Sequence, residues 1–172
     1  MRIIRFGVGL VLWWTTSGFC EGGTLHVPDP GLGITTLQQA LDAATAGDTI
    51  LLAAGVHFGN AQVTGKAGLR VRGVSTAKTI LDAAPNAPTA SGPALVVDDC
   101  DGFELERVTV RHARAATGSG AGIVIQDSDQ VRLDRVLVVD CEEAGVVITG
   151  NFASLSQCEI AGCEGGIDVA GD

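Results

Sequence analysis

Four aspartates have the residue type and the spacing to hold a metal ion together. The positions of Asp99 and Asp127 differ by 28, as do those of Asp101 and Asp129, and Asn151 follows Asp129 by 22. Carboxylate and amide oxygens are the ligands that hard cations prefer. The alternative is that Asp and Asn stand here because turns favour them. A shared cation therefore requires that the segments around Asp99 and Asp127 lie side by side.

A basic cluster, VRHAR, supplies the candidates for proton transfer. Arg111, His112 and Arg114 lie together in it, and we nominate these three as catalytic candidates. The alternative is a solvated turn, in which exposed basic side chains contribute little to stability. We identify no cofactor-binding residue.

Two of the five cysteines, Cys141 and Cys163, occupy positions that differ by 22. If they stand on neighbouring strands of an exported protein, their separation suits a disulfide. A stack of buried thiols is the alternative. The spacing of cysteine and histidine does not indicate a zinc site.

The composition limits the class of protein and of partner. The 172 residues suit one domain, and the hydrophobic share of 46% suffices for a core. A net charge of −9 argues against nucleic acid or an anionic membrane as the main partner.

The N-terminal segment 1–22 predicts a secretory signal. Arg2 and Arg5 precede the apolar run Phe6–Trp14, which is too short to span a bilayer, and a polar region follows. A buried first strand and a lipoprotein acylated at Cys20 are the alternatives. We expect a protein without a membrane span that is secreted, periplasmic or at the cell surface. Signal cleavage removes both tryptophans and the chain has no tyrosine, so little aromatic surface is expected, with Phe103 and Phe152 in the core.

Behind the signal, the sequence predicts one short helix and several strands. The helix covers Ile34–Ala46, with a capping box of Thr36 and Gln39, and Gly47 ends it. Its apolar face should lie across the end of another element. Strand-like patterns occupy Thr24–Val27, Thr49–Phe58, Leu69–Val74 and Lys78–Ala83. A proline-rich loop, Ala84–Pro93, follows the last of them.

A repeat with a step of about 22 residues organises the rest of the chain. Three apolar columns recur at matching spacings: Leu95, Ile123, Val146 and Ile167; Leu105, Leu133 and Leu155; and Val110, Val138 and Ile160. Within each unit apolar residues alternate, as in strands. Stacked units bury these columns, which predicts a three-sided β-solenoid. Outward charges at matching positions predict ion pairs between coils: Glu106, Arg107, Asp134 and Arg135.

The segment TTLQQALDAATAGDTILLAAGVHF, followed by LRVRGVSTAKTILDA and the coils, resembles the right-handed parallel β-helix proteins of the pectate-lyase-like superfamily. The resemblance covers residues 23–172 as one domain. It implies an all-β, right-handed parallel β-helix of about 22 residues per coil, with a short N-terminal capping helix. Members include polysaccharide lyases, glycoside hydrolases, epimerases, tailspikes, adhesins and proteins without known activity, so the fold alone does not give the function.

The resemblance also implies what an enzyme of this kind would need. Its lyases use calcium to bridge an acidic protein to an acidic sugar, with a base that is usually Arg or Lys. Asp99, Asp101, Asp127 and Asp129 would then hold calcium, and the basic cluster would supply the base. The GHG, RIK and WIDH elements of two enzyme groups do not occur in the chain.

The sequence stops at GIDVAGD, partway through a coil. We therefore expect a fragment, a truncated gene product, or a protein that pairs end to end at this coil. Two functions follow. One is an exported surface or envelope scaffold or binding module, for a polysaccharide or a cell-surface component. The other is the N-terminal part of a polysaccharide-processing enzyme, either a calcium-assisted uronate lyase or a glycoside hydrolase.

Overall fold

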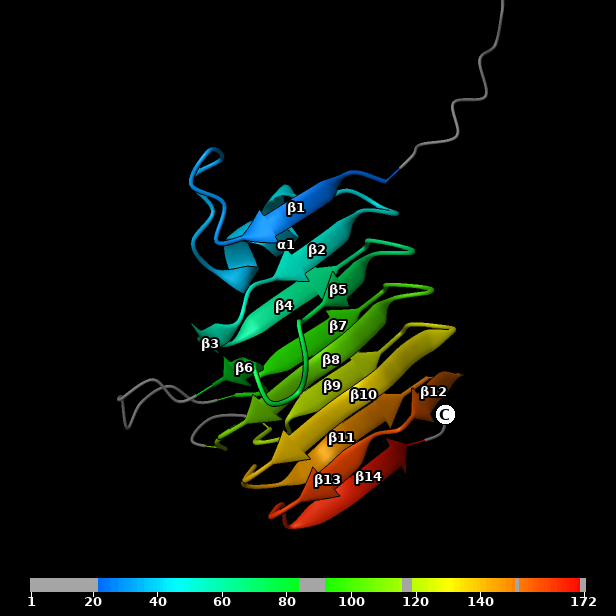
Figure 1. Cartoon of the computed structure of the whole chain (residues 1–172). Coiled ribbons are helices and arrows are strands. Elements are labelled where there is room, and N and C mark those ends of the chain that lie inside the picture. Colours follow the sequence, from blue (N-terminus) through cyan, green and yellow to red (C-terminus); the bar gives the residue numbers. More distant parts are fainter. Residues whose placement is uncertain (1–21, 84–91, 116–118, 151, 171–172) are drawn as a thin grey trace, which may run out of the picture.

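Short parallel strands wind into stacked coils in the computed structural model, which describes residues 22–83, 92–115, 119–150 and 152–170 (Figure 1). The elements are β1 (Thr24–Val27), α1 (Leu37–Ala43), β2 (Thr49–Leu52), β3 (Gly55–Phe58), β4 (Ala61–Thr64), β5 (Arg70–Arg72), β6 (Thr79–Asp82), β7 (Leu95–Asp98), β8 (Glu104–Arg111), β9 (Ile123–Gln126), β10 (Val131–Val139), β11 (Ala144–Thr149), β12 (Ala153–Ser156), β13 (Glu159–Ala161) and β14 (Gly165–Ala170). The predicted right-handed parallel β-helix is confirmed.

Two parallel sheets form the three sides of the coil. One sheet has the order β14-β11-β9-β7-β4. The other contains β1-β2-β5-β8-β10-β12, and β3, β6 and β13 continue it along the second halves of β8 and β10. Arg107 and Arg135 have positive φ angles of 57° and 53° within those two long strands. We infer that the backbone turns there, so that one sheet supplies two sides.

The strand register confirms all three apolar columns. Ile123 pairs with Leu95 and Val146, and Val146 pairs with Ile167. Leu133 lies between Leu105 and Leu155, and Val138 between Val110 and Ile160. A step of one residue would turn these side chains outward, so the columns fix the register.

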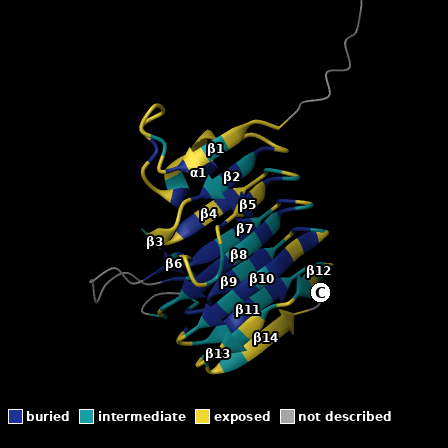
Figure 2. Cartoon of the chain, viewed as in Figure 1, coloured by how far each residue is buried: buried dark blue, intermediate teal, exposed yellow. Residues whose placement is uncertain are grey.

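The columns form the core, which runs as a buried band through the coils (Figure 2). Leu105, Ile123 and Leu133 have no exposed surface. Burial of one such side chain contributes about 1.5–3 kcal/mol. In the last described coil Ile167 and Val169 are 50% and 63% exposed. End-to-end pairing on this coil stays a prediction.

The helix α1 lies across the coil end beside β1 and β2, as expected for a cap (Figure 1). Thr36 and Gln39 form the predicted capping box, and Leu37, Ala40 and Leu41 are buried. The helix ends earlier than predicted, at Ala43, because the next residue, Ala44, is already extended.

Asp48 ties the first coil to the residues after the helix. Its carboxylate accepts hydrogen bonds from the Gly23 amide at 2.5 Å, the Thr45 amide at 2.7 Å and the Thr45 hydroxyl at 2.9 Å. The Thr45 amide is the main cause that holds the pKa of Asp48 below its ordinary value, against the opposing effect of burial.

One strand prediction was wrong in detail, and one strand was missed. The segment predicted as one strand, Thr49–Phe58, forms β2 and β3, because the chain turns a corner of the coil at residues 53–54. β4 was not predicted at all; its alternating burial pattern follows only the short segment AQVT.

No described helix has the length and hydrophobicity needed to cross a membrane. The predicted signal lies, but for Gly22, outside the described residues, as do Asn151 and most of the predicted loop Ala84–Pro93.

Candidate functional site

A buried aspartate joins two of the three predicted catalytic candidates. Asp82 is 4% exposed. One carboxylate oxygen, Oδ2, accepts a hydrogen bond from Nε of Arg111 at 2.8 Å, and the other, Oδ1, accepts one from Nδ1 of His112 at 3.0 Å. We call these three residues the Asp82 cluster.

The sheet register places the cluster. Asp82, the last residue of β6, pairs with Arg111, the last residue of β8. Their inner neighbours Leu81 and Val110 are buried in the core, so alternation turns Asp82 and Arg111 outward. Two outward side chains of opposite charge on paired residues are close enough to interact.

His112 reaches the same carboxylate through an unusual backbone conformation. It follows β8 with a φ of 61°, in the left-handed region that few residues other than glycine adopt. A carboxylate can only accept, so Nδ1 of the ring carries the proton that it donates to Asp82. Nε2 is then the basic atom, and it has no partner among the described residues. A carboxylate behind an imidazole is the arrangement that orients a general base.

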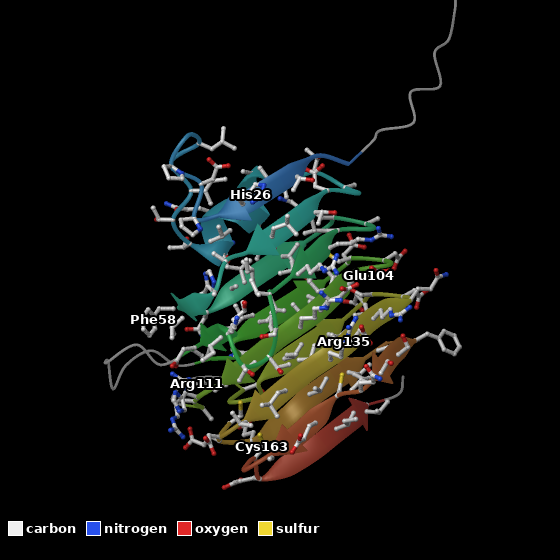
Figure 3. The ribbon with its side chains drawn as sticks, viewed as in Figure 1. His26, Phe58, Glu104, Arg111, Arg135 and Cys163 are labelled. Carbon is white, nitrogen blue, oxygen red and sulfur yellow. The ribbon has the colours of Figure 1, made fainter. Side chains whose placement is uncertain are left out.

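An exposed aromatic ring lies in the next coil. Phe58, the last residue of β3, pairs with Asp82 and is 56% exposed. Figure 3 shows Phe58 and Arg111 on the same edge of the molecule. The expectation of little aromatic surface was therefore wrong at this edge. Phe103 is fully buried as predicted, but Phe152 is 74% exposed because it lies in the turn before β12, outside the alternating pattern.

Arg114, the third catalytic candidate, is not brought to Asp82 by any contact within the described part of the chain. Its carbonyl accepts a hydrogen bond from the Gly92 amide at 2.7 Å, in an isolated bridge, and its side chain is exposed.

The four predicted calcium ligands occupy stacked turns, between β7 and β8 and between β9 and β10. Asp101 Oδ1 accepts a hydrogen bond from the Asp129 amide at 2.8 Å, which is ordinary turn chemistry. Asp99 and Asp127 have φ angles of 50° and 46°, which aspartate tolerates. The described residues contain no group of three or more His, Cys, Asp or Glu side chains arranged to hold a metal ion. Calcium binding stays a prediction.

The aspartate turns and the Asp82 cluster lie at opposite ends of β8. Asp101 precedes the strand, and Arg111 is its last residue. A calcium ion at these aspartates would therefore not contact the Asp82 cluster.

Cys141 and Cys163 are neighbours in successive coils, as predicted, and both are free thiols here. Burial raises the pKa of Cys141 to about 11, and the nearby Cys163 adds to the rise. A disulfide between them stays a prediction.

Sequence reasoning missed Asp82 and the exposure of Phe58. The repeat spacing could not reveal that Asp82 faces Arg111, because the stretch between them includes the loop that breaks the period. The available signal was an aspartate in the strand pattern Lys78–Ala83, where a charged residue needs a partner.

Known structures share this fold. A pectin methylesterase variant in complex with a hexasaccharide aligns at a TM-score of 0.64 with 17% identity, over 82% of this chain and 49% of its own. A pectin methylesterase from Erwinia chrysanthemi aligns at 0.61 with 15% identity, over 81% and 49%. An alginate lyase from Paenibacillus sp. str. FPU-7 aligns at 0.58 with 21% identity, over 77% and 43%.

The chain thus spans about half the length of these solved structures or slightly less. No family model and no curated protein matches its sequence. At these identities the likeness concerns the fold alone: the chain is a parallel β-helix, as these enzymes are.

Proposed function

We propose that this chain belongs to an exported protein that acts on an acidic polysaccharide, as a uronate lyase whose base is His112. The observation that carries the proposal is the orientation of His112 by the buried Asp82, with Arg111 on the same carboxylate. The named substrates of the structural neighbours, pectin and alginate, are uronic acid polymers, which supports this substrate class.

Arg111 would bind the sugar carboxylate. Its Nε–H is held by Asp82, but a guanidinium has five N–H donors, and its side chain is 32% exposed. Charge-assisted hydrogen bonds from the free donors would stabilise the negative charge that develops on the carboxylate when the neighbouring carbon loses its proton.

His112 would take that proton on Nε2. The electron pair of the broken C–H bond forms a carbon–carbon double bond, and the bond from the next ring carbon to the glycosidic oxygen breaks. The departing oxygen takes a proton from water, and the hydroxide that remains takes the proton held by His112, which restores the base. The products are an unsaturated uronate end and a shortened chain.

Phe58 would support the sugar ring. Exposed aromatic faces commonly line carbohydrate sites, and this ring stands one coil from Asp82. No step of this scheme involves the distant aspartates, so any calcium they bind would stabilise the fold.

A second candidate is an exported scaffold or binding module for a polysaccharide or a cell-surface component. The observation that favours it is the pairing of both Arg111 and His112 with one buried carboxylate, because such pairing can serve stability alone. Both candidates place the protein outside the cytoplasm, in line with the predicted signal.

The test is release of unsaturated uronate from polygalacturonate and from alginate, followed by ultraviolet absorbance. His112→Asn should slow it by about 10²–10⁴-fold, and asparagine tolerates the left-handed backbone at this position. His57→Asn is the matched control, since Nε2 of His57 is occupied by the Ala53 carbonyl at 3.0 Å. Equal rates in both variants would exclude His112 as the base. No product from the wild type, with binding retained, would favour the scaffold.

A further inference from the structure

A groove of about 430 Å³ opens at the turn where the larger sheet changes direction. Its lining includes Val74 and Ser75 from the β5–β6 connection, Arg107 from β8, Arg135 and Leu137 from β10, and Gln157 from the β12–β13 connection. We call it the Arg107 groove. Figure 3 marks Arg135 on this side, away from the edge that carries Phe58 and Arg111.

Three long polar side chains occupy one turn position in successive coils. Glu106 pairs with Asp134, and Asp134 with Ser156, so the residues that follow them, Arg107, Arg135 and Gln157, stack. Their φ angles are 57°, 53° and 53°.

Such backbone favours small residues over long ones. The turns that precede β5, β8 and β10 follow that rule at one stacked position, which holds Gly65, Asp99 and Asp127, and depart from it once, at Gln130, whose φ is 58°. At the groove, by contrast, a long side chain takes this costly conformation in three successive coils, and strained residues gather at functional sites.

Arg107 supplies the available charge of the groove. The predicted ion pairs between coils form only in part: Glu106 pairs with Arg72 of the preceding coil at 3.4 Å, but Arg135 is bound to Asp134 in its own coil at 2.6 Å. Arg107 has no ion pair within the described residues. Glu159 also lines the groove, and its carboxylate is a negative charge opposite in sign to Arg107.

The rest of the lining suits a sugar. Val74 is 49% exposed and Leu137 is partly exposed, which offers an apolar wall. The hydroxyl of Ser75 and the amide of Gln157 can exchange hydrogen bonds with sugar hydroxyls, while Arg107 can take a carboxylate. A uronate has the three matching features: an apolar ring face, hydroxyl groups and a carboxylate.

The groove and the Asp82 cluster lie at the two ends of β6. That strand has four residues, or about 13 Å, between the β5–β6 connection and Asp82. One polysaccharide chain can therefore span both.

We propose that the Arg107 groove is a second binding site for the same acidic polysaccharide, in which Arg107 holds the carboxylate of a uronate remote from the Asp82 cluster. This inference rests on the proposed substrate class. The Arg107 groove would bind the polysaccharide without reacting with it, so the inference does not require that the protein cleave its substrate.

The test is calorimetric titration with a long galacturonate oligomer and with its fully methyl-esterified counterpart. Arg107→Gln should weaken binding of the acidic oligomer about tenfold, the loss expected for one charge-assisted hydrogen bond. Glutamine already adopts this backbone at Gln157, so the variant should fold. Arg132→Gln, an exposed site outside the groove with the same charge change, should bind as the wild type does.

Equal affinities of the Arg107→Gln and Arg132→Gln proteins would overturn the inference, and so would equal binding of the acidic and esterified oligomers. If His112→Asn abolishes turnover while Arg107→Gln binds normally, the groove fails and the proposed function stands. If Arg107→Gln weakens binding but the wild type forms no product, the groove stands and the lyase fails. Absence of binding by the wild type overturns both.

Discussion

Asp82→Asn should destabilise the protein by about 2 kcal/mol, because the carboxylate is buried and accepts hydrogen bonds from both Arg111 and His112. Each hydrogen bond to a charged group contributes about 1.5–3 kcal/mol. Asparagine keeps one acceptor oxygen but turns an NH₂ group toward the other donor. The Arg111 and His112 side chains are 32% and 33% exposed, so they regain water and the loss stays below the sum of two bonds.

The measurement is the melting temperature of the Asp82→Asn protein, which should fall by about 4–8 °C. Asp140→Asn is the control, because Asp140 is an exposed aspartate at the same edge and loses the same charge. Equal melting temperatures for the two variants would refute the argument that Asp82 holds the cluster together.

Four further predictions concern the scaffold. Leu133→Ala should lower the free energy of unfolding in urea by about 2–5 kcal/mol, because Leu133 is fully buried. Leu32 is 64% exposed, so Leu32→Ala should change that free energy by no more than about 0.5 kcal/mol. The pKa of Asp48 is lowered in the folded protein, so the wild type should be more stable than Asp48→Asn by a constant amount above about pH 4. This difference in the free energy of unfolding should shrink as the pH falls further. A difference that does not change with pH down to acid unfolding would contradict this. In the reduced protein Cys141, whose pKa is raised to about 11, should resist alkylation at about pH 8 by mass spectrometry, and rapid labelling of the folded protein would contradict its burial. Calcium should raise the melting temperature if the stacked aspartate turns bind it, and no shift at millimolar calcium would remove that site.

The fold was predictable because its main signal is periodic. Leu105, Leu133 and Leu155 must share a column to be buried, and the structure pairs them as their spacing requires. The capping helix was equally accessible, since its start depends on the local pair Thr36 and Gln39. The corners of the coil were harder to predict, because the composition of the sequence does not change at the break between β2 and β3.

The candidate site was predictable only in part. The basic cluster drew attention to Arg111 and His112 by residue type. Their common partner, Asp82, is distant in sequence, and the intervening loop hides the register that brings them together. Arg107 could not be separated from Arg135 by sequence, because both occupy the same repeat position and differ only in the ion pair that one of them makes.

Nitrogen NMR of the His112 ring, with and without a galacturonate oligomer, tests whether His112 is the base. We predict a proton on Nδ1 that depends on Asp82, and a shift of the Nε2 resonance on addition of the oligomer, both absent from the His57 signal. A proton on Nε2 in the free protein, or an Nε2 resonance unchanged by saturating oligomer, would contradict the assignment of His112 as the base that faces an acidic sugar.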